Sequence, residues 1–383
     1  MQNRFLFFFL LIILSLNSYA SLSEKIEKFV WDDLEVVWIK DNRFPTYALT
    51  VYFADGALSD NPAFMGETEM MFNLLTSGSN KYSQKQISDT LDFYGASIDT
   101  QVTHEYSSME VSGLVKDVVP TMQMVCHLFN NANYPNNEIK NYKEHSLSAL
   151  DGIVINHSAL ANRIFREVSL ENTPIVRPTE GYKATIKKIM QSHLRQKLDY
   201  FNRQVSKRVY LVGPDTLDVV KKVLLDDCGW SGMSKKEMFK RTVEIKKNEE
   251  SGEQIIYLVP VPNANQAQIR IGQFLTKSEA SEENLMQLSA SFLGGGFSSK
   301  LMQELRVKRG LTYSASAYAS AQKNYGRSGI STFTKNETIK EAFNTIKLVL
   351  DDVSRGKFLE DEFQLVKYLA EVIYLDMNKM VIL

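Results

Sequence analysis

Apolar and polar positions in the first half of the chain follow strand-like and helix-like periods in turn. Alternation with a period of two indicates a strand, and apolar residues three or four apart indicate a helix. Glycines such as Gly78 and Gly95 end the helical stretches. The pattern predicts two strands, two helices, two strands and two helices, at residues 34–39, 47–53, 66–75, 83–93, 96–102, 107–114, 118–129 and from 136 past 150.

The same order of elements recurs in the second half. Two glycine junctions, Tyr94-Gly95-Ala96 and Arg309-Gly310-Leu311, fall at matching places in the two copies. The predicted elements are strands at 255–259 and 268–274, helices at 282–292 and 298–308, strands at 311–319 and 329–333, and helices at 337–354 and from 359. A repeat of roughly 200 residues is too long for a solenoid. We therefore expect two copies of one α+β domain, each with a mostly antiparallel sheet and helices on one face.

A polar stretch rich in Lys and Glu separates the two copies. We interpret residues 231–253 as a charged linker between an N-terminal domain (21–230) and a C-terminal domain (254–383), and a solvated helix within one domain is the alternative. Copy one continues through a further predicted strand at 208–213, whereas copy two has no counterpart of that strand. An α+β domain without it has an open sheet edge, so the second domain is expected to be incomplete at its C-terminus.

Residues 1–20 have the pattern of a secretory signal peptide. Arg4 precedes an apolar run over residues 5–16, and Ser18 and Ala20 place small residues three and one before a cut. The run is too short to cross a bilayer as a helix, and no later stretch reaches 18 apolar residues. The expectation is an exported chain without a membrane span after cleavage, periplasmic in a bacterium. An uncleaved anchor is the alternative.

Charge and cysteine content exclude several classes of protein. With 44 Lys and Arg against 45 Asp and Glu, the net charge is −1, and a nucleic-acid binder would have a basic surplus. Cys126 and Cys228 are too few for a disulfide framework or a zinc ribbon. We expect Cys126 to be a small buried hydrophobic residue, and a bond between the two cysteines is the less favoured interpretation.

A motif in the second copy resembles a known family. Residues 292–301 (FLGGGFSSKL), followed by Glu304-Leu305-Arg306 and by residues 309–314 (RGLTYS), closely resemble the second domain of the pitrilysin/insulinase-type zinc peptidases. The likeness is greatest to the mitochondrial processing peptidase and its short bacterial homologues. In the first copy, residues 56–66 and 78–83 resemble the segments on either side of that family's catalytic helix, and the resemblance covers about residues 30–375.

The zinc motif of that family is lost here. Active members carry His-x-x-Glu-His, in which two histidines bind zinc and the glutamate is the general base. The matching residues are Glu69-Met70-Met71-Phe72-Asn73, and the third-ligand position near 148–150 has no glutamate. Phe72 cannot accept a proton from water. The resemblance therefore implies a non-catalytic member with no metal or cofactor in this chain.

Other functional positions of the family are retained. The resemblance matches Arg306 and Tyr313 to a pair that assists the substrate and the transition state in trans, because a guanidinium binds carbonyls and a phenol donates to an oxyanion. It implies that Gly294, Gly295, Gly296 and Phe297 line the substrate chamber. The alternatives are a surface arginine, a packed tyrosine and a structural glycine turn. The glycine run lacks the spacing of a phosphate-binding loop.

This mixture of lost and kept residues leads to our functional hypothesis. The chain is expected to be a pseudo-enzyme subunit that pairs with a zinc-bearing homologue, the two domains forming one half of a clamshell chamber around unfolded peptides. The alternative is a peptide-binding or assembly protein of the same fold with no peptidase role. A decayed gene product that no longer folds fully is a third possibility.

Overall fold

The computed structural model describes residues 26–32, 34–230, 255–276, 283–322 and 325–364 of the chain. Residue contacts divide these into two compact units. Unit 1 contains the described residues up to Lys140 and those from Lys188 to Trp230. Unit 2 contains residues 141–187 and the described residues from 255 onward.

Unit 1 is built on a six-stranded sheet in the order β1-β2-β6-β3-β5-β4. Its neighbours pair antiparallel except β2 and β6, which are parallel. In β2 and β6, buried residues alternate with less buried ones, so each strand turns one side toward the core. The strands are β1 (Ile26–Trp31), β2 (Leu34–Lys40), β3 (Thr46–Phe53), β4 (Ser97–Val102), β5 (Ser107–Leu114) and β6 (Lys207–Gly213).

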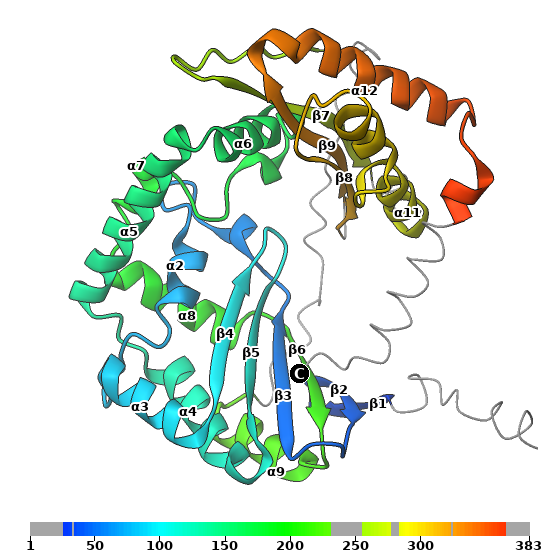
Figure 1. Ribbon diagram of the computed structural model, residues 1–383. Helices are drawn as coiled ribbons and strands as arrows, with labels where there is room; N and C mark the ends of the chain where they lie inside the picture. Colours follow the sequence, from blue (N-terminus) through cyan, green and yellow to red (C-terminus); the bar gives the residue numbers. More distant parts are fainter. Residues whose placement is uncertain (1–25, 33, 231–254, 277–282, 323–324, 365–383) are drawn as a thin grey trace, which may run out of the picture. The chain divides into compact units, whose positions relative to one another are not determined.

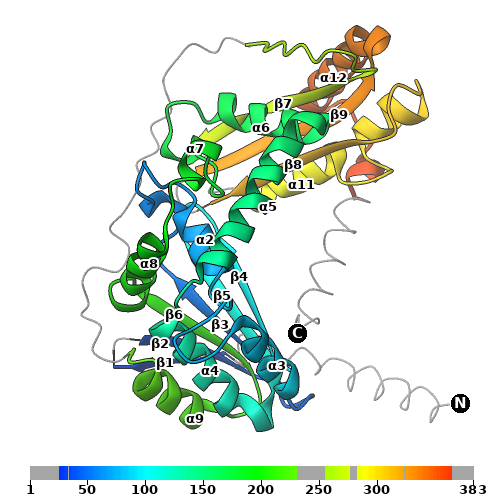
Figure 2. The ribbon, with the colours of Figure 1, turned by 90° about the vertical axis from the view of Figure 1, so that its left-hand side faces the viewer.

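Helices of unit 1 cover one face of this sheet, as Figures 1 and 2 show from two directions. They are α2 (Glu67–Asn73), α3 (Gln84–Tyr94), α4 (Val118–Asn131), α8 (Gln191–Arg203), α9 (Leu217–Lys222) and the following π-helical turn η6 (Val223–Asp227). Ser83 caps α3 in a capping box with Gln86, and Gly95 ends the helix in the left-handed conformation with φ 58°. The helix therefore stops where the glycine signal predicts.

Aromatic rings fill the core of unit 1 beneath these helices. The ring centroid of Phe53 on β3 lies 5.4 Å from that of Phe72 on α2, 5.6 Å from Phe129 on α4 and 5.8 Å from Phe201 on α8. Trp230 completes the cluster at 5.6 Å from Phe129. One strand and three helices thus meet in a single set of edge-to-face and stacked rings.

Unit 2 has a three-stranded antiparallel sheet in the order β7-β9-β8. Its strands are β7 (Gln266–Thr276), β8 (Ala315–Ala321) and β9 (Tyr325–Lys335). Helix α6 lies against one face of the sheet, and α11 and α12 lie on the other (Figures 1 and 2). The helices are α5 (Asn136–Ile155), which begins in unit 1, α6 (His157–Ser169), α7 (Lys183–Ile186), α11 (Glu283–Gly294), the π-helical segment η7 (Met302–Val307) and α12 (Ile339–Ser354).

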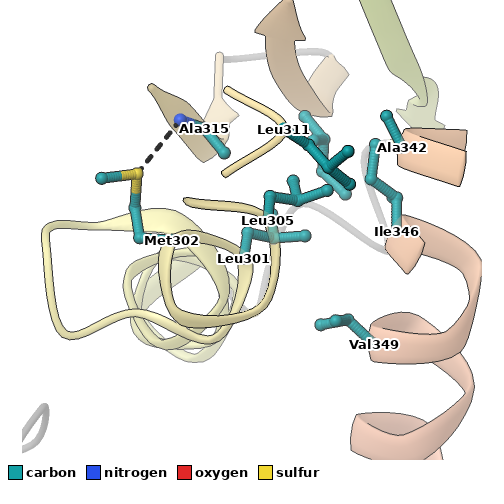
Figure 3. Packing of buried hydrophobic residues seen from close by; sticks show 9 residues of the cluster. Leu301, Met302, Leu305, Leu311, Ala315, Ala342, Ile346 and Val349 are labelled. Atoms are coloured by element: carbon teal, nitrogen blue, oxygen red, sulfur yellow. Dashed lines mark hydrogen bonds between the residues drawn. The ribbon is translucent and has the colours of Figure 1, made fainter. Parts of the chain in front are cut away.

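An aliphatic cluster holds the helical layer of unit 2 against its sheet (Figure 3). Leu301 and Leu305 from the η7 region and Ile346 from α12 are fully buried. They meet Ala315 and Ile330 of the sheet, and Ile269 and Ile271 of β7 pack against the same cluster. Burial of such side chains stabilises a fold by about 1.5–3 kcal/mol each.

The repeat predicted from the sequence is present in the topology. In both units a strand, two helices, two strands and a helix follow in order, and the sheet segment β3-β5-β4 corresponds to β7-β9-β8. Gly95 and Gly310 take left-handed φ values of 58° and 64° at the matching junctions. The two mostly antiparallel α+β domains are thus confirmed.

Some details differ from the expectation. Residues 255–259 were expected to form a strand, but they form no strand in the structure. Residues 141–187 cluster with unit 2, since α6 packs on β7, although we had assigned them to the N-terminal domain. The signal peptide, the linker and residues 365–383 lie outside the described residues. Within the described part, no helix has the length and apolarity needed to cross a membrane.

Candidate functional sites on the two units

The first candidate site is the loop that leads into α2. The Asp60 carboxylate accepts hydrogen bonds from the Gly66 amide at 2.8 Å, from the Thr68 amide at 3.2 Å and from the Thr68 hydroxyl. These are the first amides of α2, so Asp60 holds the N-terminus of the helix from six residues away. Gly66 has φ 96°, a conformation that a glycine adopts without strain.

A buried ion cluster fixes this loop to α8. The Lys197 ammonium lies 3.4 Å from the Asp60 carboxylate and 3.0 Å from that of Glu67, and it donates to the Ser59 carbonyl at 3.0 Å. All three charged side chains are under 10% exposed. Burial raises the pKa of Asp60 to about 6, although Lys197 and the Thr68 hydrogen bond act in the opposite direction. Two carboxylates thus share one ammonium in this cluster.

Glu69, Phe72 and Asn73 occupy the degenerate motif positions on α2. Glu69 is half-buried and Asn73 is exposed, with the Asn73 amide donating to the Glu69 carbonyl at 2.9 Å. Phe72 is 2% exposed, and its ring centroid lies 5.2 Å from that of Phe201. The position where a general base would act is therefore part of the aromatic core.

The side chains at these positions have the wrong chemistry for a zinc site. Tetrahedral zinc takes thiolate, imidazole or carboxylate ligands, three of them from the protein in a catalytic site. Only Glu69 belongs to that set. The third-ligand segment at 148–150 lies in α5 and ends in the buried Leu150. Among the described residues, no three His, Cys, Asp or Glu side chains are close enough together to bind a metal ion.

The second candidate site lies on unit 2, where the structure brings Arg306, Phe297 and Tyr313 together. The Arg306 guanidinium carbon lies 5.4 Å from the ring centroid of Phe297 and 5.9 Å from that of Tyr313. The Arg306 Nη1 also donates to the Tyr313 carbonyl at 3.0 Å. Both rings are largely exposed, at 62% and 76%. Arg306 therefore lies against two exposed aromatic rings on the surface of unit 2.

The loop that carries Phe297 is fixed from beneath. The Gln303 side chain donates to the Phe297 carbonyl at 2.8 Å. Glu304, one residue further along, accepts from Lys308 and from Arg309. The pKa of Glu304 is lowered, because these hydrogen bonds and charges outweigh its partial burial. The η7 segment thus supports both the loop and Arg306.

The glycines at positions 294–296 do not all have the same role. A Cβ on Gly294, the last residue of α11, would lie 2.1 Å from the Ala317 amide nitrogen, so only glycine lets α11 approach β8 this closely. Gly295 is similarly restricted by Ser291, whereas a Cβ on Gly296 would meet nothing within 4 Å. Gly294 therefore has a role in packing α11 on β8, whereas Gly296 and Phe297 are exposed to solvent.

The structure corrects the expectation that Cys126 and Cys228 are not bonded to each other. Cys126 on α4 and Cys228 after η6 form a disulfide, with Cα atoms 4.4 Å apart and a separation of 102 positions in the sequence. Both side chains are buried. The sequence does not reveal the bond because the pairing depends on how α4 packs on η6, which no local pattern records.

The sequence does not predict the ion cluster. Asp60 belongs to the segment that resembles the family's lead-in, and its partner Lys197 lies 137 residues further along the chain. A lysine on the buried face of an amphipathic helix is the signal that would have indicated a buried acidic partner.

Two family models match the chain. The model described as insulinase, peptidase family M16, matches residues 35–181, and the model of the peptidase M16 inactive domain matches residues 208–368. The chain belongs to the M16 peptidase family. With neither histidine nor the base at its motif positions, it is an inactive M16 member.

Relatives and solved structures agree with this assignment. The chain is 22% identical over 366 residues to the "non-peptidase homolog YmxG" of Helicobacter pylori, covering 93% of this chain and 81% of that protein. A protease from Helicobacter pylori superimposes with a TM-score of 0.79 at 13% identity, over 93% of this chain and 86% of that one. A peptidase M16 inactive domain from Pseudomonas fluorescens gives 0.75 at 15% identity, over 90% and 83%. The two structures share the M16 fold with this chain.

Proposed function

We propose that this M16 protein is a non-catalytic subunit that pairs with a zinc-bearing homologue and helps it to enclose and cleave unfolded peptides. The observation that carries the proposal is an asymmetry between the two units. On α2 the base position has become the core residue Phe72, whereas unit 2 presents Arg306 between exposed Phe297 and Tyr313. In this proposal the partner supplies the zinc and this chain supplies Arg306 and Tyr313.

The retained pair has a defined chemical role in such a complex. Only one of the five N–H donors of Arg306 is used in the bond to the Tyr313 carbonyl, so the remaining donors suit a peptide carbonyl or carboxylate. The Tyr313 hydroxyl suits the oxyanion that forms when zinc-bound water attacks. A single oxyanion donor contributes about 10²–10³-fold to kcat in other enzymes.

We further propose that the chain is exported. The buried disulfide supports this proposal, because such bonds persist in oxidising compartments and are rare in the cytosol. The leader pattern at residues 1–20 points the same way.

The direct test mixes the purified chain with a zinc-bearing M16 homologue of the same organism and measures peptide cleavage. We expect the wild-type chain to raise kcat, and Arg306→Ala or Tyr313→Phe to remove at least tenfold of that stimulation. Lys347→Ala, an exposed residue of α12 in the same unit, is the matched control. If both variants stimulate as well as the wild type, the alternative of a peptide-binding or assembly protein replaces this proposal.

A further inference from the structure

A single hydrogen bond anchors the guanidinium of Arg306. Its Nη1 donates to the Tyr313 carbonyl at 3.0 Å, and the side chain is exposed. In a guanidinium, the Nε and Nη2 hydrogens lie on another edge, point in the same direction and match the two oxygens of a carboxylate. With Nη1 bonded to the main chain, this Nε–Nη2 edge is the one that suits a bidentate ligand.

Two aromatic rings with free apolar surface lie beside this guanidinium. The Arg306 Cζ lies 5.4 Å from the ring centroid of Phe297 and 5.9 Å from that of Tyr313, within the range of a cation–π contact. Both rings are mostly exposed to solvent. A group of one arginine and two aromatic residues has the composition that is enriched in protein-binding surfaces.

The backbone that carries these side chains is held by the interior of unit 2. Leu305, next to Arg306, is fully buried. The Thr332 hydroxyl on β9 donates to the carbonyl of Ser314, next to Tyr313, at 2.8 Å. The exposed group is thus preorganised, which lowers the entropy cost of binding a ligand.

The charge near Arg306 favours an anion. Lys308 and Arg309 share the single carboxylate of Glu304. In the described part of the chain, no acidic side chain forms an ion pair with Arg306, whose hydrogen-bond acceptor is the Tyr313 carbonyl. Three cations and one carboxylate therefore lie in this short segment, and its net charge is positive.

We propose that Arg306, Phe297 and Tyr313 form a recognition site for a carboxylate that adjoins an apolar side chain in an unfolded peptide. The carboxylate accepts both hydrogens of the Nε–Nη2 edge, and the apolar side chain packs on the exposed rings. A main-chain carbonyl has one oxygen and no charge, so its contact with this edge is weaker. The inference rests on the proposed function and names the class of peptide that the chain selects.

Two parts of a peptide supply this chemistry. One is the free C-terminal carboxylate of a peptide that ends in an apolar residue such as leucine. The other is the side chain of an Asp or Glu next to such a residue. Both present a planar anion beside an apolar group, so the test has one arm for each.

The test titrates short fluorescent peptides into the purified chain, with no zinc-bearing partner present, and measures binding by fluorescence anisotropy. One pair of peptides ends in leucine, with either a free carboxylate or an amide. The second pair has both ends blocked and a central Leu-Glu or Leu-Gln. In at least one pair, we expect the acid to bind about tenfold or more tightly than its neutral partner, because the neutral peptide loses a charge-assisted bidentate contact. The pair that shows the preference identifies the source of the carboxylate.

Variants of the chain locate the binding site. Arg306→Lys keeps the charge but loses the paired donors, so we expect it to bind the preferred acid about tenfold more weakly. Phe297→Ala should weaken binding about threefold or more through lost apolar contact. Lys347→Ala and Leu348→Ala, at exposed positions of α12 in the same unit, are the matched controls and should bind as the wild type does.

Several results overturn this inference. They are equal binding of acidic and neutral peptides, no binding of either acid by the wild type, and wild-type affinity in Arg306→Lys. Because no cleavage is measured, the outcome is separate from that of the proposed function. A chain that selects carboxylates but does not stimulate a zinc-bearing homologue keeps the inference and contradicts the proposed function, and stimulation without a carboxylate preference does the reverse.

Discussion

At the scale of single residues, the change that defines this protein is the conversion of a catalytic position into a core position. Phe72 lies within 5.5 Å, centroid to centroid, of both Phe53 and Phe201, and it is buried. A phenyl ring neither accepts a proton nor tolerates water beside it. The same side chain therefore removes the general base and stabilises unit 1.

Truncation of Phe72 tests this role. Phe72→Ala should lower the free energy of unfolding by about 3–5 kcal/mol, through lost burial and the cavity left behind. Phe93→Ala, at an 81% exposed position, should change it by less than about 0.5 kcal/mol. Urea denaturation followed by circular dichroism measures both. A loss under 1 kcal/mol for Phe72→Ala would show that position 72 is not a core position.

The raised pKa of Asp60 predicts how the free energy of unfolding depends on pH. Its folded-state pKa of about 6 lies above the unfolded value of about 3.9, so the folded chain binds this proton more tightly between those values. The stabilisation from this group is complete below about pH 4 and is lost as the pH rises through 6. The free energy of unfolding of the wild type, minus that of Asp60→Asn, should fall by about 2–3 kcal/mol from pH 4 to pH 7.

The control for that measurement is Ser88→Ala, an exposed residue of α3 without a titratable side chain. Its difference from the wild type should stay constant over the same range. Parallel profiles for Asp60→Asn and the wild type would mean that Asp60 is not held in the buried cluster with Lys197 and Glu67.

At the scale of elements, the disulfide joins α4 to the end of unit 1. Closing a loop of about 100 residues restricts the unfolded chain by up to roughly 5 kcal/mol in the chain-entropy view. Cys126→Ala with Cys228→Ala should lower the free energy of unfolding by about 2–5 kcal/mol. Thiol reductant should destabilise the wild type and leave the double variant unchanged. Two titratable thiols in protein recovered from an oxidising compartment would contradict the assignment.

Element types were predictable from the sequence, and long-range partners were not. The periods at 47–53, 83–93 and 337–354 correspond to β3, α3 and α12 because burial on one side imposes them. The 255–259 segment shows the limit of that reasoning. An apolar run predicts a strand, but a strand forms only where another strand offers its edge.

The candidate sites show the same division. Arg306 and Tyr313 lie seven residues apart in one helix-turn-strand segment, so the resemblance of that local motif was enough to single them out, and their contact needs no long-range packing. Lys197 and Asp60 belong to segments far apart in sequence, as do Cys126 and Cys228, and only the packing of α8 and α4 brings each pair together. No periodicity in one stretch of chain carries that information.

At the scale of the whole molecule, two copies of one α+β domain have diverged in what they keep. On α2 of unit 1 the motif positions lack the side chains of a zinc site, whereas unit 2 keeps the exposed arginine–aromatic group of Arg306, Phe297 and Tyr313. The pairing that we propose, in which a homologue contributes zinc and this chain contributes to substrate handling, would account for both features.

The most direct measurement of this account compares zinc content and peptide cleavage for the pure chain, alone and with a zinc-bearing M16 homologue. We predict less than a tenth of an equivalent of bound zinc, no chelator-sensitive cleavage by the chain alone, and cleavage by the mixture above that of the homologue. Stoichiometric zinc together with chelator-sensitive cleavage by the pure chain would contradict the account.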